Sequence, residues 1–211
     1  MTACLRAMGH EVNHKRIGRL MRLMGLQAIY PKPNLSKTVA NVPAKYPYLL
    51  KGLFIQRPNH VWSTDITFCL RQGFVYLVAV MDWFSRYVLS WEISNSLDTC
   101  FCLSAMEKAF QKKPEIFNND QGSQFTNPAY VQSLETSGVR ISWDGRGRAM
   151  DNIFIERLWR SVKYEEVYLK DYANVLEAIN GINRYFHFYN TQRPHQSLGY
   201  KTPEQVFFSQ K

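Results

Sequence analysis

Residues 61–70 alternate between apolar and polar side chains. A period of two predicts a β-strand with one buried face. Two further runs, residues 74–81 and 87–93, are rich in Val, Tyr, Leu and Ile, and Asp82 to Arg86 form a turn between them. We therefore predict three consecutive antiparallel strands, the first of which places Trp62, Ile66, Phe68 and Leu70 on one face and Ser63, Asp65 and Thr67 on the other.

The following segment mixes helical and strand patterns. Asp98 and Asp151 are placed as N-caps, Pro128 as a helix start and Gly138 as a helix stop. These signals predict helices over residues 98–113, 128–138, 151–170 and 174–189, and short strands over 115–119 and 139–143. The order predicts an α/β fold, in which a mixed sheet is covered by helices.

The N-terminal residues 13–25 form a basic amphipathic pattern that ends at Gly25. An ordinary surface helix and the second helix of a small DNA-reading unit explain it equally well. Little sequence precedes it, so we expect a partial helix-turn-helix-like region over residues 1–29, truncated at its front. A proline-rich linker over 30–58, a core over 59–190 and a tail over 191–211 complete the predicted organisation.

The net charge of the chain indicates which class of partner it binds. Lys and Arg number 26 against 17 acids, which gives a formal net charge of +9 and favours a polyanion such as nucleic acid. No apolar run approaches the roughly 20 residues of a membrane-spanning helix, so we expect a cytoplasmic, nucleoid-associated protein without a membrane partner. The four cysteines are scattered and form no C-x-x-C pair, and they therefore indicate neither a disulfide framework nor a zinc site.

Three acids are candidates for chemistry. Asp65 lies on the polar face of the first strand, Asp120 follows the fourth, and Glu156 lies one turn inside the long helix. If the first and fourth strands are neighbours, the two aspartates converge and the helix brings the glutamate over them. Three crowded carboxylates repel one another unless a cation lies between them, and oxygen ligands favour Mg²⁺ or Mn²⁺.

The motifs around these acids resemble a known family. Thirty-five residues separate Asp120 from Glu156, with "WSTDIT" before and "DNIFIERLWRSVK" after, which resembles the D,D-35-E core of transposases and retroviral integrases. "NNDQGSQFT", "GRGRAMDNIFIERLWRSVKYEEVY" and "YNTQRPHQSLGYKTP" resemble, more narrowly, the second-frame product of bacterial insertion sequences of the IS-three family. The similarity extends to the front segment "VNHKRIGRLMRLMGLQAIYPK" and so covers essentially the whole chain.

This resemblance implies a ribonuclease-H-like five-stranded core and a metal-dependent polynucleotidyl transferase. Asp65, Asp120 and Glu156 would hold two divalent ions, Mg²⁺ or Mn²⁺, once DNA is bound. The implied reaction is cleavage of one strand at an element end, followed by strand transfer of the released 3′-hydroxyl. The implied partners are double-stranded DNA with terminal inverted repeats, target DNA, further copies of the chain on DNA, and an upstream reading frame fused to this one.

Several polar residues are candidates for DNA contacts. Arg160 and Lys163 follow Glu156 by four and seven residues and share its helix face, and Lys163 also matches a basic position of the family. Arg193 belongs to the tail motif, where a phosphate contact and a structural role are equally consistent with the sequence. Further candidates are Arg146, Arg148, Gln121 and Ser123.

Two other readings stay open at this point. A truncated, non-catalytic DNA-binding product could regulate or inhibit transposition, which the abrupt front end favours and the intact acids do not. A structure-specific nuclease on the same scaffold would explain the acids, but neither the tail motif nor the basic front helix.

Overall fold

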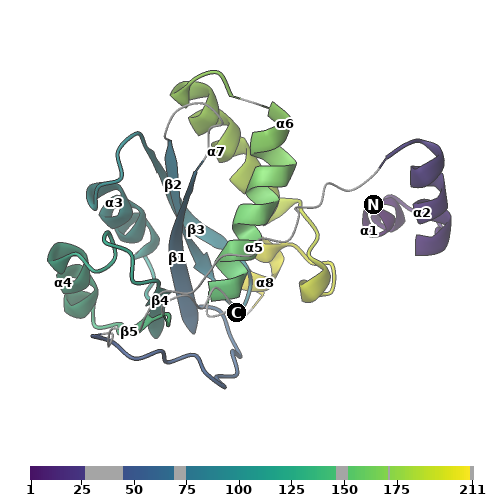
Figure 1. Cartoon of the computed structure of the whole chain (residues 1–211). Helices are drawn as coiled ribbons and strands as arrows, with labels where there is room; N and C mark the ends of the chain where they lie inside the picture. Colours follow the sequence, from purple (N-terminus) through teal and green to yellow (C-terminus); the bar gives the residue numbers. More distant parts are fainter. Residues whose placement is uncertain (27–44, 69–74, 146–151, 171, 210–211) are drawn as a thin grey trace.

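A single mixed sheet organises the protein (Figure 1). The computed structural model describes residues 1–26, 45–68, 75–145, 152–170 and 172–209. Its five strands lie in the order β3-β2-β1-β4-β5. They span β1 (Val61–Phe68), β2 (Tyr76–Asp82), β3 (Val88–Ser94), β4 (Ile116–Asn119) and β5 (Arg140–Trp143). The predicted mixed α/β sheet is confirmed.

Strand directions follow from the connections. β1, β2 and β3 pair antiparallel through short links, as predicted, and the β2–β3 turn is organised by the buried Asp82. Oδ1 of Asp82 accepts hydrogen bonds from both the backbone N–H and the hydroxyl of Ser85, and Oδ2 accepts one from the N–H of Asn59. β4 and β5 join the other edge in parallel after helical crossovers. Asp82 therefore stabilises the turn that was predicted between these strands.

Helices cover both faces of the sheet (Figure 1). On one face, α3 (Cys100–Ala109) and α4 (Pro128–Ser137) bury an apolar cluster that includes Trp62 and Phe117. On the other, α5 (Ile153–Val162) and α7 (Val175–Thr191) pack against Leu77 and Met81 of β2. Helices therefore cover both faces of β2, which explains why residues 77–82 are buried without interruption.

Two predicted caps differ from the structure. α3 begins after Thr99 and ends at Ala109, before the lysines of the predicted last turn; Asp98 is not its N-cap, although its Oδ1 accepts a 2.9 Å bond from the N–H of Cys100. α5 begins after Asn152, and Asp151 lies outside the described residues. The single helix predicted over 151–170 continues from α5 as a π-helical turn, η2 (Lys163–Val167), and a last turn, α6 (Tyr168–Lys170).

The ends of the chain are helical. α1 (Thr2–Ala7) precedes α2 (His14–Leu23), whose N-cap Asn13 accepts a bond from the N–H of Arg16 and which ends before the left-handed Gly25. The predicted basic helix is confirmed. In the tail, a 3₁₀ turn, η3 (Gln196–Leu198), leads to α8 (Pro203–Phe208), which opens with a capping box. Within the described residues, no helix has both the length and the apolar character needed to span a membrane.

Residues 45–58, the described half of the predicted linker, lie against the sheet. The N–H of Leu49 donates to the hydroxyl of Ser142 on β5, and Leu50 is buried together with Val61 and Trp83. Their apolar residues follow no helical or strand period, so the sequence pattern did not reveal this packing. The proposed domain boundaries stay a prediction.

Candidate active site

The pairing of β1 with β4 brings two of the three acids together. The parallel register aligns Val61 with Ile116 and Ser63 with Asn118. Continued by two residues, the same register places Asp65 opposite Asp120, just where β4 ends. The charge of Asp120 raises the pKa of Asp65, so the two side chains lie within electrostatic reach of each other.

Asp65 has the most perturbed environment of the three acids. Loss of hydration, followed by the charge of Asp120, raises the pKa of the Asp65 carboxyl to about 7, and Glu156 adds a smaller increase. A hydrogen bond of 2.8 Å from the indole Nε1 of Trp159 to Oδ2 of Asp65 acts in the opposite direction, because it favours the ionised form. The surroundings of Asp65 therefore bring the pKa of its carboxyl close to neutral pH.

Asp120 is fixed by the turn that follows it. Its Oδ1 accepts a 2.8 Å bond from the backbone N–H of Gly122, which lowers the pKa of Asp120, whereas loss of hydration raises it by more. A β-carbon added at Gly122 would lie 2.9 Å from the same oxygen. The glycine therefore leaves the space that the carboxylate occupies, which explains why a glycine follows so closely after the strand.

Glu156 reaches the site from α5. Loss of hydration raises the pKa of Glu156, Lys163 lowers it, and Asp120 raises it, so both charges lie within electrostatic reach. Ile155, Leu158 and Val162 are buried on the opposite side of the helix. The amphipathic pattern of α5 thereby turns Glu156 toward the aspartates.

Asn152 ties the start of α5 to the strand of Asp65. It is the N-cap residue but makes no side-chain capping bond; instead its Nδ2 donates a 3.4 Å bond to the carbonyl oxygen of Thr64. Trp159 makes the second connection, seven residues along the helix. α5 is thus attached to β1 on both sides of Glu156.

The donor set fits a hard divalent cation. Every pair among Asp65, Asp120 and Glu156 interacts unfavourably as ionised groups, and the ligands are all carboxylate oxygens, which Mg²⁺ and Mn²⁺ prefer. A carboxylate has about four lone-pair positions, so the bonds from Trp159 and Gly122 leave acceptor capacity. Among the described residues, no group of three acidic, histidine or cysteine side chains is arranged closely enough to hold a metal ion. Glu156 is exposed on α5.

The predicted DNA-contacting residues have different environments. Lys163 and Arg160 lie on α5 and its continuation, near Glu156. Gln121 donates a 2.8 Å bond to the carbonyl oxygen of Asp144, and Ser123 is exposed in the turn beyond Asp120. Arg146 and Arg148 lie outside the described residues.

Arg193 is engaged within the protein. Its Nε donates a 2.8 Å bond to Oε2 of Glu165 and its Nη2 a bond to Oε1, which gives a two-point ion pair. Asp144 is buried and accepts a 2.8 Å bond from Nδ2 of Asn118 on β4. Both residues therefore stabilise loops around the core.

Trp159 is the site residue that sequence reasoning missed. Its side chain is buried in the core, but its indole N–H donates a hydrogen bond to Asp65. The available signal was its position three residues after Glu156, which places it beside the glutamate on the helix surface.

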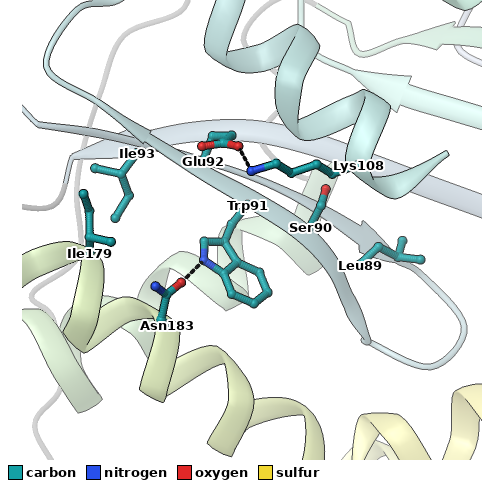
Figure 2. Close-up of a pocket in the computed structure, with 8 residues that line it drawn as sticks. All are labelled: Leu89, Ser90, Trp91, Glu92, Ile93, Lys108, Ile179 and Asn183. Atoms are coloured by element: carbon teal, nitrogen blue, oxygen red, sulfur yellow. Dashed lines mark hydrogen bonds and ion pairs between the residues drawn. The ribbon is translucent and has the colours of Figure 1, made fainter. Parts of the chain in front are cut away.

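A separate cavity of about 380 Å³ lies between the edge strand β3 and helix α7 and contains none of the three acids (Figure 2). Trp91 projects into it and donates a 2.8 Å bond from its Nε1 to Oδ1 of Asn183. Glu92 and Lys108 form an ion pair at its border. This cavity is therefore separate from the candidate active site, which lies where β1 and β4 carry Asp65 and Asp120.

Comparison with known families supports the same core. Residues 55–149 and 137–203 match two models described as integrase core domain, and residues 1–34 match an HTH-like domain. The catalytic core domain of the HTLV-2 integrase, solved in complex with magnesium, superposes with a TM-score of 0.59 at 24% identity, over 72% of this chain and 97% of that one. The ribonuclease-H-like fold predicted from the motifs is confirmed.

Relatives along the full chain are transposases. The transposase for insertion sequence element IS904 of Lactococcus lactis subsp. lactis (strain IL1403) is 32% identical over 97% of this chain and 84% of its own length. Transposase InsF for insertion sequence IS3A of Escherichia coli (strain K12) is 27% identical over 97% of this chain and 74% of its own. The chain therefore belongs to the family of insertion-sequence transposases, as its motifs indicated.

Proposed function

We propose that this transposase cuts and joins DNA with divalent cations held by Asp65, Asp120 and Glu156. The observation that carries the proposal is the register of β1 and β4, which places Asp65 opposite Asp120, with Glu156 of α5 within electrostatic reach of both. Three ionised carboxylates this close repel one another, and a cation bound among them relieves the repulsion. A non-catalytic DNA-binding product gives no reason for this arrangement.

The bound cations, Mg²⁺ or Mn²⁺, would supply Lewis-acid activation of the attacking oxygen and charge neutralisation at the scissile phosphate. The protein's own groups do the rest. Asp65 and Asp120 are positioned by the register of their strands and by the bonds from Trp159 and Gly122. Glu156 would complete the ligand set from helix α5. No serine or cysteine nucleophile is required, because water or a 3′-hydroxyl attacks the phosphate directly.

Basic groups would hold the DNA strand at this edge. Lys163 and Arg160 lie on the helix that carries Glu156, where they would contact phosphates beside the scissile bond. Gln121 and Ser123, beyond Asp120, would orient the same strand. Arg146, Arg148 and Arg193 remain proposed DNA contacts on the strength of the sequence motifs. The proposed substrates are terminal inverted repeats and target DNA, bound by more than one copy of the chain, with an upstream-frame fusion partner.

The test is cleavage and joining of a labelled oligonucleotide that carries an element end. We expect activity with Mn²⁺ or Mg²⁺, loss on removal of the metal with EDTA, and loss in Asp120→Asn. Glu107→Gln, which neutralises an exposed acid on α3, is the matched control and retains activity. Equal activity of Asp120→Asn and wild type would contradict the proposal.

A binding measurement separates metal affinity from catalysis. Mn²⁺ at about 100 times its Kd stabilises a folded state by about 2.7 kcal/mol, so it should raise the melting temperature of the wild type. Glu156→Gln should show a smaller rise, whereas Glu107→Gln should match the wild type. An equal rise in all three proteins would place the cation elsewhere.

A further inference from the structure

A second cluster of charge lies on another face of α5. Phe154, Arg157 and Ser161 are separated by three and four residues, so they share a helix face that differs from the face of Glu156 and Lys163. This face lines a cavity of about 110 Å³. The β2–β3 turn, helix α7 and the tail complete its walls with Arg86, Tyr189, Arg193, His195 and Ser197.

The walls of this cavity are basic and hydroxylated. Three arginines and two serines line it, and no acidic side chain is among its described lining residues. Arg193 is neutralised by Glu165. In the described part of the chain, the guanidinium groups of Arg86 and Arg157 have neither a hydrogen-bond nor an ion-pair partner. The cavity therefore presents positive charge next to hydroxyl donors, and Asp82, which does not line it, compensates part of the charge of Arg86.

The backbone of Arg86 has an energetically unfavourable conformation. Its φ of 64° is in the left-handed region, which is unfavourable for a side chain other than glycine or asparagine by about 1 kcal/mol. The turn imposes this conformation, because the N–H of Arg86 bonds to the carbonyl oxygen of Asp82. The guanidinium carbon then lies 3.4 Å from the ring centroid of Phe154. Stacking on the ring directs the charge along the cavity wall.

Burial lowers the pKa of Arg86 to about 10. Tyr189 and the carboxylate of Asp82 act in the opposite direction, and repulsion from Arg157 adds a smaller decrease. Burial and the charges of Arg193 and Arg86 lower the pKa of His195 to about 4, so the imidazole is neutral. Arg193 can only donate, and its Nη1 lies 3.3 Å from Nε2 of His195. Nε2 therefore accepts, which makes Nδ1 the protonated nitrogen.

We propose that the cavity formed by Arg86, Arg157, Ser161 and Ser197 binds one phosphate group of a DNA strand, at a position separate from the acids. Its volume is below the roughly 300 Å³ at which pockets for whole small ligands begin, and it thus fits a single phosphate of a longer molecule. Planar guanidinium groups and hydroxyls are suited to phosphate oxygens. The inference rests on the protein acting on DNA, but not on the roles proposed for the carboxylates.

Salt dependence of DNA binding tests the proposal. Binding of a short duplex is measured in EDTA, so that no metal-dependent step contributes and a failure of the carboxylate proposal would leave the result unchanged. Loss of one phosphate contact lowers the slope of log Kobs against log salt by about 0.9. We expect Arg157→Gln to show this decrease with a roughly tenfold weaker Kd at low salt, irrespective of DNA sequence, and Arg157→Lys to keep most of the affinity.

The matched control is Arg184→Gln, which removes an exposed arginine from α7 outside this cavity. It should leave the slope unchanged. Arg86→Asn is the second cavity variant, since asparagine tolerates the left-handed backbone and the fold is kept. If both cavity variants bind DNA like the wild type and like Arg184→Gln, and the phosphate test below also shows no difference, the proposal is overturned. An equal loss in Arg184→Gln would also overturn it, because it would show a general effect of net charge.

Inorganic phosphate distinguishes the two sources of the anion. At constant ionic strength, millimolar phosphate should raise the melting temperature of the wild type and of Arg184→Gln, but not that of Arg157→Gln. A phosphate effect that depends on Arg157, with unchanged DNA binding, would support the phosphate pocket but assign it to a free phosphate or mononucleotide. A phosphate effect that is equal in all variants would overturn the pocket.

Discussion

The indole Nε1 of Trp159 on α5 donates a 2.8 Å hydrogen bond to Oδ2 of Asp65 on β1. This bond joins the helix of Glu156 to the strand of Asp65, and it favours the ionised form of a carboxylate that burial and Asp120 hold near neutrality. A buried aromatic residue thereby sets both the position and the charge of a proposed metal ligand.

Trp159→Phe should keep the ring in the core but remove the donor. We expect the pKa of Asp65 to rise further, so that Mn²⁺ binds more weakly and the pH at which cleavage reaches half its maximum moves upward. A lost hydrogen bond to a charged group also lowers the free energy of unfolding by about 1.5–3 kcal/mol. Mn²⁺ titrations and pH–rate profiles of the oligonucleotide reaction measure the first two effects.

Trp91→Phe is the control for this substitution. Its indole likewise donates a 2.8 Å bond, to Asn183, but at the cavity beside β3. It should leave the Mn²⁺ affinity and the pH profile as in the wild type. A similar shift in both variants would mean that Trp159 acts through general stability and not through Asp65.

Gly122→Ala should reduce activity with little loss of stability. The new β-carbon would lie 2.9 Å from Oδ1 of Asp120, and the carboxylate, as the end of a side chain, can rotate away. We expect cleavage to fall at least tenfold while the urea midpoint changes little. Gly18→Ala on α2, where a β-carbon has no neighbour within 4 Å, should change neither. A fully active Gly122→Ala would show that the position of Asp120 is not critical.

The lowered pKa of His195 predicts that the folded protein loses stability in mild acid. Its pKa is lowered to about 4 in the folded protein, against about 6.5 in the unfolded chain. Between these values the unfolded chain binds a proton that the folded state does not, so the free energy of unfolding decreases as the pH falls from about 6.5 to about 4, by up to about 3 kcal/mol. Urea unfolding at several pH values measures this decrease.

His195→Gln should remove that part of the pH dependence. The variant is expected to lose stability at pH 7.5, because the ring packs edge-on against Tyr189, but the deficit should shrink as the pH approaches 4. His187→Gln, at the exposed surface of α7, is the matched control. Parallel curves for wild type and His195→Gln would contradict the assigned environment.

The fold was predictable wherever burial imposes a period. Residues 61–68 alternate because one side of the strand faces α3 and α4, and Pro128 and Gly138 bound α4 through their backbone preferences. Residues 45–58 were read as linker because packing on a sheet edge requires only a few apolar contacts, such as Leu50, and these leave no repeating pattern.

The convergence of Asp65 and Asp120 was predictable only on the assumption that the first and fourth strands are neighbours, which the strand order confirms. A helical crossover makes β4 parallel to β1, so both carboxylates come to the same edge. The hydrogen bond of Trp159 was not predictable, because sequence does not say where the polar atom of a buried indole points. The basic cavity was not predictable either, since Arg86, Arg157 and His195 come from three segments that are linked by no motif.

The alignment of β1 with β4 determines which mutations the protein tolerates in these strands. The main-chain register between β1 and β4 sets the relative position of the two aspartates, because Ser63 pairs with Asn118 through backbone groups that no side-chain substitution alters. Deleting a single residue from β4 would shift this register by one residue and move Asp120 to the other face of the sheet. Insertions and deletions in this four-residue strand should therefore be more damaging than most substitutions in it.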